Sequence, residues 1–370
     1  MMLGCDGRPF YLKQIIKENH GGCIRAVCCN RRAAFGNVVA SLSDYQLNIY
    51  DSGNEDHDLD LFLYFKQSQK LRTMMWLDVP YDLSYNSLYS KLPSFDTHMN
   101  TSKTNRYLCY LAVSGNSKSI DIISITKQKI VQRLCGHSKA VIDIVQPYYS
   151  SKEYADLVIS ASVDGAIYLW HWPTGNLLHS ISLSCRKFCV NESKEGSILC
   201  ITNKGKLQEI QITAISGIVR MQLVQSFPMS NTFYDNIQYN KNKEIAVCKS
   251  SKGKIVYWKL QYDGNQVPQW IVHTKKHIPH LAQGAGFSIS VDGNFLCLGN
   301  DTGSLFVFDF DSLQLLQQLD NKSQFTSKDC SFSDTGSIYQ VGNSPHLLRW
   351  QPIDPDAITS YKQQITEPTV

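Results

Sequence analysis

The sequence predicts an all-β protein, a seven-bladed β-propeller closed by an N-terminal strand in the last blade. Three observations lead to this prediction: a composition poor in charge and rich in aromatics, a recurring strand–turn–strand pattern, and a last unit that lacks one strand. Charged residues make up only 18% of the 370-residue chain, which also contains 19 tyrosines. Aromatic side chains favour strands, whereas Glu, Lys and Arg favour helices.

The recurring pattern is clearest between Leu157 and Trp170. An apolar run there is followed by Asp164-Gly165, a pair that suits a turn with positive φ. A second apolar run follows and ends in Trp170, so the segment is typical of a β-hairpin. Similar hairpins elsewhere also end in a bulky residue, and these residues serve as a ruler along the chain. The ruler residues are Tyr50, Ile123, Trp170, Ile210, Trp258, Phe308 and Trp350. The fourth unit departs most from the pattern, because Ile210 replaces an aromatic residue and Lys204-Gly205-Lys206 forms its turn.

The spacing between ruler residues indicates the period of one blade. The spacings are 73, 47, 40, 48, 50 and 42 residues, and removing the polar segment 80–105 brings the first one to 47. A period of ~40–45 residues is typical of propeller blades. Each interval also holds an outer and an inner strand candidate, such as 177–182 and 141–145, so we expect four strands per blade. The predicted propeller covers residues 9–351, with 80–105 as an insert and 352–370 as a C-terminal tail.

The seventh unit ends after its third strand, at Trp350. A strand-like segment at 9–17 precedes the first inner strand candidate at 23–30. Placed in the last blade, this segment would supply the missing strand, close the ring and remove its open edges.

The unit ending in Trp170 also contains a candidate polar network. His137 precedes its inner strand, Ser160 or Ser162 lies on the next strand and Asp164 lies in the turn. This pattern resembles the His–Ser–Asp–Trp network of WD repeats, in which each buried polar group has a partner. A catalytic pair of His137 and Asp164 is the alternative, but both residues stand where the repeat needs them for its own architecture.

More narrowly, the sequence resembles the EED/extra sex combs family, the non-catalytic propeller subunit of Polycomb repressive complex 2. The resemblance lies in Lys17-Glu-Asn-His20, in the hairpin 37–50, in 71–76 and, most specifically, in 111–170. It implies a nuclear scaffold without enzymatic activity or cofactor. Such a scaffold would bind and order a SET-domain histone methyltransferase subunit and contact other Polycomb subunits, with a histone tail as a further candidate partner.

The same resemblance implies an aromatic cage for trimethylated lysine at one mouth of the propeller channel, since a quaternary ammonium needs several aromatic faces. The equivalent positions are Arg25, Arg72, Gln283 and Gly284, none of which is aromatic. Two arginines there would repel trimethyl-lysine, so we expect the cage to be lost. Arg25 and Arg72 also permit a cationic mouth for a carboxylate, phosphate or acidic peptide. Solvated rim residues are the simpler alternative.

Other features weigh against several function classes. The net charge of +4 includes no basic block, which argues against direct nucleic-acid binding, and no apolar run reaches the length of a membrane span. The 12 cysteines lack metal-ligand spacing, and we interpret them as reduced thiols. Catalytic motifs such as Gly-x-Ser-x-Gly, the P-loop and His-Glu-x-x-His are absent. A propeller enzyme would instead need acids or metal ligands clustered at a channel mouth.

An unrelated WD-repeat adaptor, in ubiquitin ligation or vesicle traffic, is the alternative function. Ligase receptors often end a blade with Trp-Asp-x-Arg. The residues that follow Trp170, Trp258 and Trp350 do not form this motif. Its absence argues against a ubiquitin-ligase receptor but not against an adaptor in vesicle traffic.

Overall fold

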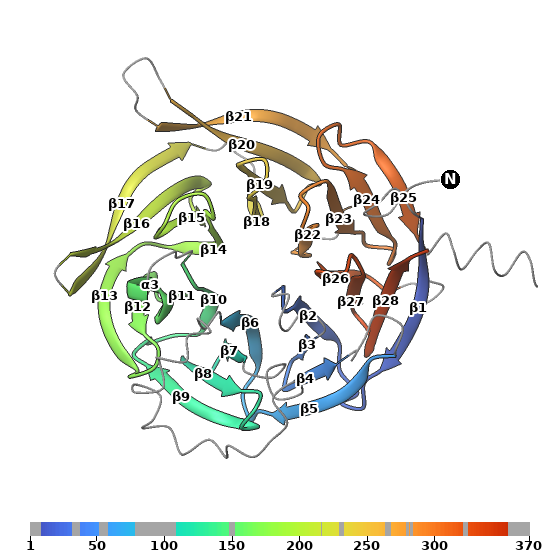
Figure 1. Cartoon of the computed structure of the whole chain (residues 1–370), viewed down its shortest axis with the longest axis horizontal. Helices are drawn as coiled ribbons and strands as arrows, with labels where there is room; N and C mark the ends of the chain where they lie inside the picture. The colour runs from blue at the N-terminus through green and yellow to red at the C-terminus, as the bar shows by residue number, and fades with distance from the viewer. Residues whose placement is uncertain are drawn as a thin grey trace, which may run out of the picture.

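The described residues form seven four-stranded antiparallel sheets. The structure is a computed structural model that describes residues 9–31, 38–51, 58–77, 109–147, 152–215, 217–228, 233–262, 268–278, 281, 284–320 and 325–353. Figure 1 shows the sheets as blades around a common axis, with the first strand of each blade innermost. The predicted all-β, seven-bladed propeller is therefore confirmed.

Each blade runs from an inner strand to an outer strand in chain order, except the last. Blade 1 contains β2 (Ile24–Cys29), β3 (Val38–Ser43), β4 (Gln46–Asp51) and β5 (Asp60–Lys66). Blade 2 contains β6 (Leu71–Leu77), β7 (Tyr110–Gly115), β8 (Ser119–Ser124) and β9 (Lys129–Cys135). Blade 3 contains β10 (Val141–Val145), β11 (Leu157–Ser162), β12 (Ala166–His171) and β13 (Asn176–Ser182), with the short helix α3 (Lys152–Ala155) before β11.

The remaining blades follow the same order. Blade 4 contains β14 (Cys185–Val190), β15 (Ser197–Thr202), β16 (Lys206–Ile215) and β17 (Ile218–Pro228). Blade 5 contains β18 (Tyr234–Asn240), β19 (Ile245–Ser250), β20 (Lys254–Tyr262) and β21 (Pro268–His277). Blade 6 contains β22 (Phe287–Ile289), β23 (Phe295–Gly299), β24 (Leu305–Asp309) and β25 (Leu315–Leu319). Blade 7 contains β26 (Ser327–Phe332), β27 (Ile338–Gly342), β28 (His346–Pro352) and β1 (Phe10–Lys17).

The ring closes through the N-terminal strand. β1 pairs antiparallel with β28, from Phe10 opposite Pro352 to Lys17 opposite His346, and the two strands lie side by side in Figure 1. Gln317 of blade 6 also exchanges two hydrogen bonds with the Phe10 backbone, at 2.9 and 3.0 Å. The predicted closure is thus confirmed, and it covers the edge that β28 would otherwise expose.

The ruler residues share one structural position. Each lies on the third strand of its blade and is at most 5% exposed. In every blade the pairing of the third strand with the outer strand shifts register immediately before the ruler residue. A bulge increases the local twist of a strand. The bulky residue therefore marks the point where each outer strand bends around the blade.

The fourth blade is complete despite its weak sequence pattern. Its outer hairpin is long, with 10 residues in β16 and 11 in β17. Ile210 is fully buried at the ruler position. Its aliphatic side chain, like that of Ile123 in blade 2, fills the site that an aromatic ring fills in the other five blades. The predicted insert 80–105 lies outside the described residues. The predicted tail 352–370 also lies outside them except for Pro352, which ends β28, and Ile353.

Candidate binding surface at the upper rim

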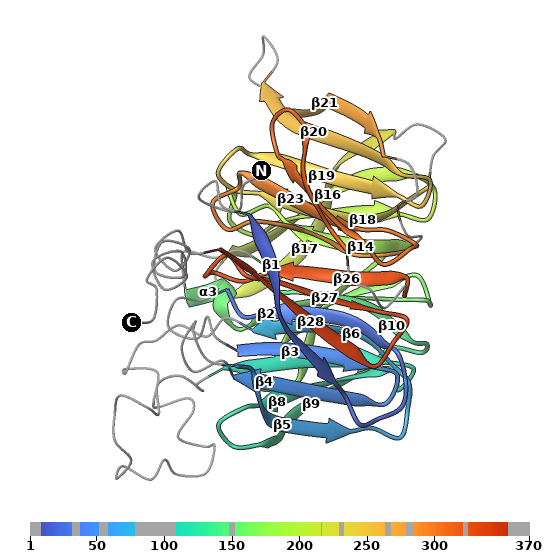
Figure 2. The ribbon, with the colours of Figure 1, turned by 90° about the vertical axis from the view of Figure 1, so that its right-hand side faces the viewer.

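All inner strands begin on the same face of the ring. In blade 1, for example, Ile24 at the start of β2 pairs with Ser43 at the end of β3, so both lie at the end where β3 turns into β4. We call this face the upper face. The opposite, lower face carries the turns between first and second strands, and α3 on the connection from β10 to β11 marks it at the left of Figure 2.

A β-bulge recurs at the second residue of the inner strand. In six of the described blades the register of the first two strands shifts at this residue. A bulge leaves its extra residue unpaired and can re-aim the side chain. We call the set of bulge residues the upper rim, which consists of Arg25, Arg72, Ile142, Arg186, Asp235 and Lys328. Three of them, Arg25, Arg72 and Arg186, are exposed, and none of the six is aromatic.

Two of the four predicted mouth residues belong to the upper rim. The Arg25 guanidinium donates to Asp44 on the β3–β4 turn, and Lys70 lies 3.0 Å from the same carboxylate. Burial would raise the pKa of Asp44, but the hydrogen bonds from these cations hold that pKa below its ordinary value. The Nε of Arg72 donates to the neutral amide of Asn116 at 2.7 Å.

The other two predicted residues precede β22. The Gly284 N–H donates to Asp235 at 2.9 Å, which joins blade 6 to the rim residue of blade 5. Gln283 lies outside the described residues. Sequence reasoning did not single out Arg186 and Lys328. A usable signal existed, because Arg25, Arg186 and Lys328 stand 25, 24 and 22 residues before the ruler residues of their units.

Two ion pairs lie beside the rim. Asp143, on β10, is 2.6 Å from the Lys187 ammonium and also accepts the Phe188 N–H at 2.7 Å. Burial would lower the pKa of Lys187, but the Asp143 carboxylate raises it above its ordinary value. Lys249 is 1% exposed and lies 3.0 Å from Asp235. These acids and cations therefore neutralise each other.

One acid on an inner strand is held differently. Asp329, on β26, accepts the N–H groups of Val27 at 3.1 Å and of Cys330 at 3.0 Å. Burial raises the pKa of Asp329 to about 7, against the opposing effects of these amides and of Lys187. A side chain at Gly286 would place its Cβ 1.7 Å from the Asp329 carboxylate, so the glycine makes room for the acid.

The predicted network of blade 3 comes together in the structure. Ser160 Oγ lies 2.8 Å from His137 Nε2 and accepts the Trp170 indole N–H at 2.8 Å. Asp164 Oδ2 is 3.4 Å from His137 Nδ1 and accepts the Ser138 N–H at 2.9 Å. Burial lowers the pKa of His137, while Asp164 opposes that change. The contacts join strands of one blade, which fits a structural role.

Blades 1 and 4 contain related networks built on a glutamate. Glu18 is 4% exposed and accepts the hydroxyls of Ser41 and, at 2.8 Å, of the ruler residue Tyr50. Glu209 is 3% exposed and accepts from Ser197 at 2.8 Å and from the Trp270 indole at 3.2 Å. Sequence reasoning missed both networks, because each glutamate stands where the repeat pattern gives no polar signal.

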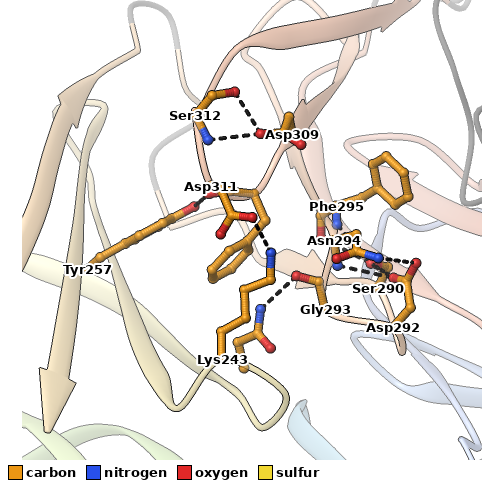
Figure 3. A network of polar contacts seen from close by, with 12 residues as sticks. Lys243, Tyr257, Ser290, Asp292, Gly293, Asn294, Phe295, Asp309, Asp311 and Ser312 are labelled. Carbon is orange, nitrogen blue, oxygen red and sulfur yellow. Dashed lines mark hydrogen bonds and ion pairs between the residues drawn. The ribbon is translucent and has the colours of Figure 1, made fainter.

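On the lower face, acidic side chains pair with residues of the same or a neighbouring turn. Figure 3 shows turns of blades 5 and 6, where Lys243 pairs with Asp311. Asp309 accepts the hydroxyl and N–H of Ser312 at 2.6 and 2.8 Å, and these hydrogen bonds lower its pKa. Asp292 likewise accepts a serine hydroxyl and a backbone N–H within its own turn. These lower-face acids therefore have local structural partners.

The described residues contain no group of three or more His, Cys, Asp or Glu side chains that could hold a metal ion. Within the same residues, no helix has both the length and the hydropathy needed to cross a bilayer.

Comparison with known proteins gives two similarities and no family assignment. Polycomb group protein FIE1 of Zea mays is 23% identical over 287 residues, which cover 70% of this chain and 61% of that protein. Pre-rRNA-processing protein crb3/ipi3 of Schizosaccharomyces pombe is 23% identical over 200 residues, which cover 52% of this chain and 38% of that protein. No family model matches the chain. The chain thus spans less than two thirds of each relative. It is a seven-bladed propeller with weak similarity to both.

Proposed function

We propose that the chain is a non-catalytic WD-repeat scaffold subunit of a Polycomb-like histone methyltransferase complex in the nucleus. The observation that supports this most is the similarity to Polycomb group protein FIE1 over 70% of the chain. The propeller fold agrees with it, because a rigid ring offers large surfaces for protein partners. The scaffold would bind and order a segment of a SET-domain subunit, and that partner would supply the catalysis.

An apolar surface on the outer strands of blades 3 and 4 suits such a partner. β13 and β17 contact each other, and both carry exposed large aliphatic side chains. We call this the β13–β17 surface, formed by Leu177, Leu178, Ile218, Leu223 and Val224. Their exposed fractions lie between 38% and 58%. Exposed apolar side chains on neighbouring strands make this surface a candidate protein interaction site.

Affinity purification of the tagged full-length chain from its own cells, followed by mass spectrometry, tests the proposal. We expect recovery of a SET-domain protein and its loss with the double variant Leu177→Asp/Leu223→Asp. Leu61→Asp is the matched control, since Leu61 is 53% exposed on the outer strand of blade 1. Absence of any SET-domain protein from the purified material would overturn the assignment to this complex.

We also propose that the chain does not read trimethyl-lysine. The cationic upper rim supports this, since Arg72 and Arg186 lie exposed where a cage would need aromatic faces. Two exposed rings lie near the rim among the described residues, Tyr45 (54% exposed) on the β3–β4 turn of blade 1 and Phe233 (62%) before β18 of blade 5, and they belong to separate blades. Titration with trimethyl-lysine peptides by fluorescence anisotropy should show no saturable binding at micromolar concentration. Micromolar binding that an Arg72→Ala change alters would contradict the proposal.

Pre-rRNA processing is the second candidate function, because crb3/ipi3 matches 52% of the chain. The same purification distinguishes the two candidates. Ribosome-assembly factors in place of a SET-domain protein would favour pre-rRNA processing. Ubiquitin-ligase or vesicle-coat components would favour the unrelated adaptor that the fold also permits.

A further inference from the structure

The upper rim has an excess of positive charge that its neighbours do not neutralise. Arg25 and Lys70 share the single carboxylate of Asp44, which leaves one positive charge over. Arg72 is held by a neutral amide. Arg186 and Lys328 make no side-chain hydrogen bond or ion pair within the described part of the chain.

The acids near the rim do not offset this excess. Asp235, the acidic member of the rim, already faces the buried Lys249 and accepts the Gly284 N–H. Asp143 is paired with Lys187. Asp329 is held partly protonated near neutral pH, because burial raises its pKa to about 7. Four cations therefore remain available on blades 7, 1, 2 and 4.

The distribution of these cations favours a peptide carboxylate over a nucleic-acid backbone. They belong to separate blades around a ring and are interrupted by Ile142 and Asp235. A phosphate backbone needs a continuous basic track, and single-stranded nucleic acid also needs aromatic platforms for its bases. An extended peptide can instead place separate Asp or Glu side chains against separate arginines, which bind carboxylates in a planar, bidentate fashion.

We propose that the upper rim is a binding site for an acidic peptide segment. Its carboxylates contact Arg72 and Arg186, with Arg25 and Lys328 adding attraction from the neighbouring blades. Binding of this kind weakens as salt rises, because Arg25, Arg72 and Arg186 are exposed and screening acts on them. This site is distinct from the β13–β17 surface, which lies on the outer strands.

The test is fluorescence anisotropy with the full-length chain and a fluorescein-labelled peptide rich in Asp and Glu. A peptide with Asn and Gln at the same positions is the uncharged control. We expect saturable binding of the acidic peptide only, and a loss of affinity of about tenfold or more in Arg72→Gln/Arg186→Gln. Lys129→Gln removes one exposed charge at the lower end of blade 2 and should leave affinity unchanged.

Three outcomes would overturn the proposal. The labelled acidic peptide could show no binding with the protein in about 100-fold molar excess over it, or it could bind equally well to the Arg72→Gln/Arg186→Gln variant. A single-stranded oligonucleotide could also bind more tightly than the peptide and depend on the same two arginines, which would identify a phosphate-backbone site instead. Circular dichroism of each variant verifies that the fold is retained, as expected for exposed side chains.

Discussion

Asp329 should make the propeller less stable as pH rises, and Asp329→Asn should remove this effect. The folded protein holds the carboxyl at a pKa of about 7, whereas an unfolded aspartate titrates near its ordinary value of 3.8. Between these values the folded state keeps a proton that the unfolded state has released. The free energy of unfolding therefore falls as pH rises from about 4 to about 7. Outside that window, the titration of Asp329 changes it little.

The size of the effect follows from the shift. About three pKa units correspond to ~4 kcal/mol, of which ~2–3 kcal/mol falls above pH 5. Asp329 is partly exposed, so screening by water makes the lower end of that range the expected value. Asn mimics the protonated carboxyl in shape and cannot ionise, so the variant gains stability relative to the native chain as pH rises.

Urea unfolding followed by tryptophan fluorescence, from pH 5 to pH 8.5, measures the difference in unfolding free energy between the two proteins. We expect that difference to move in favour of Asp329→Asn by ~2 kcal/mol across the range. Asp309→Asn is the control. The folded protein lowers the pKa of Asp309, so this carboxyl is ionised in both the folded and the unfolded state above pH 5. The difference in unfolding free energy between Asp309→Asn and the native chain should therefore stay constant across the pH range. Parallel curves for Asp329→Asn and the native chain would refute the reasoning.

The remaining predictions concern packing. Ser160→Ala should cost ~2–4 kcal/mol of unfolding free energy, since it leaves the buried Trp170 indole N–H and the Nε2 of the buried His137 without their partner. The exposed Ser180→Ala should cost less than ~0.5 kcal/mol. Gly286→Ala should lower stability by ~2–3 kcal/mol through its clash with the Asp329 carboxylate, whereas Gly22→Ala, with its nearest neighbour at 3.5 Å, should be tolerated. Urea unfolding checks both pairs, and equal losses within a pair would contradict the explanation. Deleting residues 1–17 should expose the β28 edge and cause self-association in size-exclusion chromatography, which a synthetic peptide of β1 should reverse. A monomeric, equally stable deletion variant would show that closure is dispensable.

Much of the fold was predictable because the propeller is a repeat. Hydrophobic alternation and turn residues act over a few positions, so hairpins such as the one ending in Trp170 are visible locally. The register shift at every ruler residue explains why bulky side chains recur with a regular period. The fourth blade shows the limit of pattern recognition, because Ile210 fills the ruler position through burial and carries no motif.

The sequence by itself determined the seven-blade architecture, its closure by β1 and the presence of arginines at positions 25 and 72. Only the tertiary structure decided which charges meet. Asp143 pairs with Lys187 of the next blade, and Asp329 accepts an N–H from Val27, 302 residues away in the chain. Such contacts depend on bulge geometry and on the packing of blades around the axis, which local propensities do not encode. The same packing places Arg186 and Lys328 on the rim that also carries the two predicted arginines, and so it alone defines the upper rim.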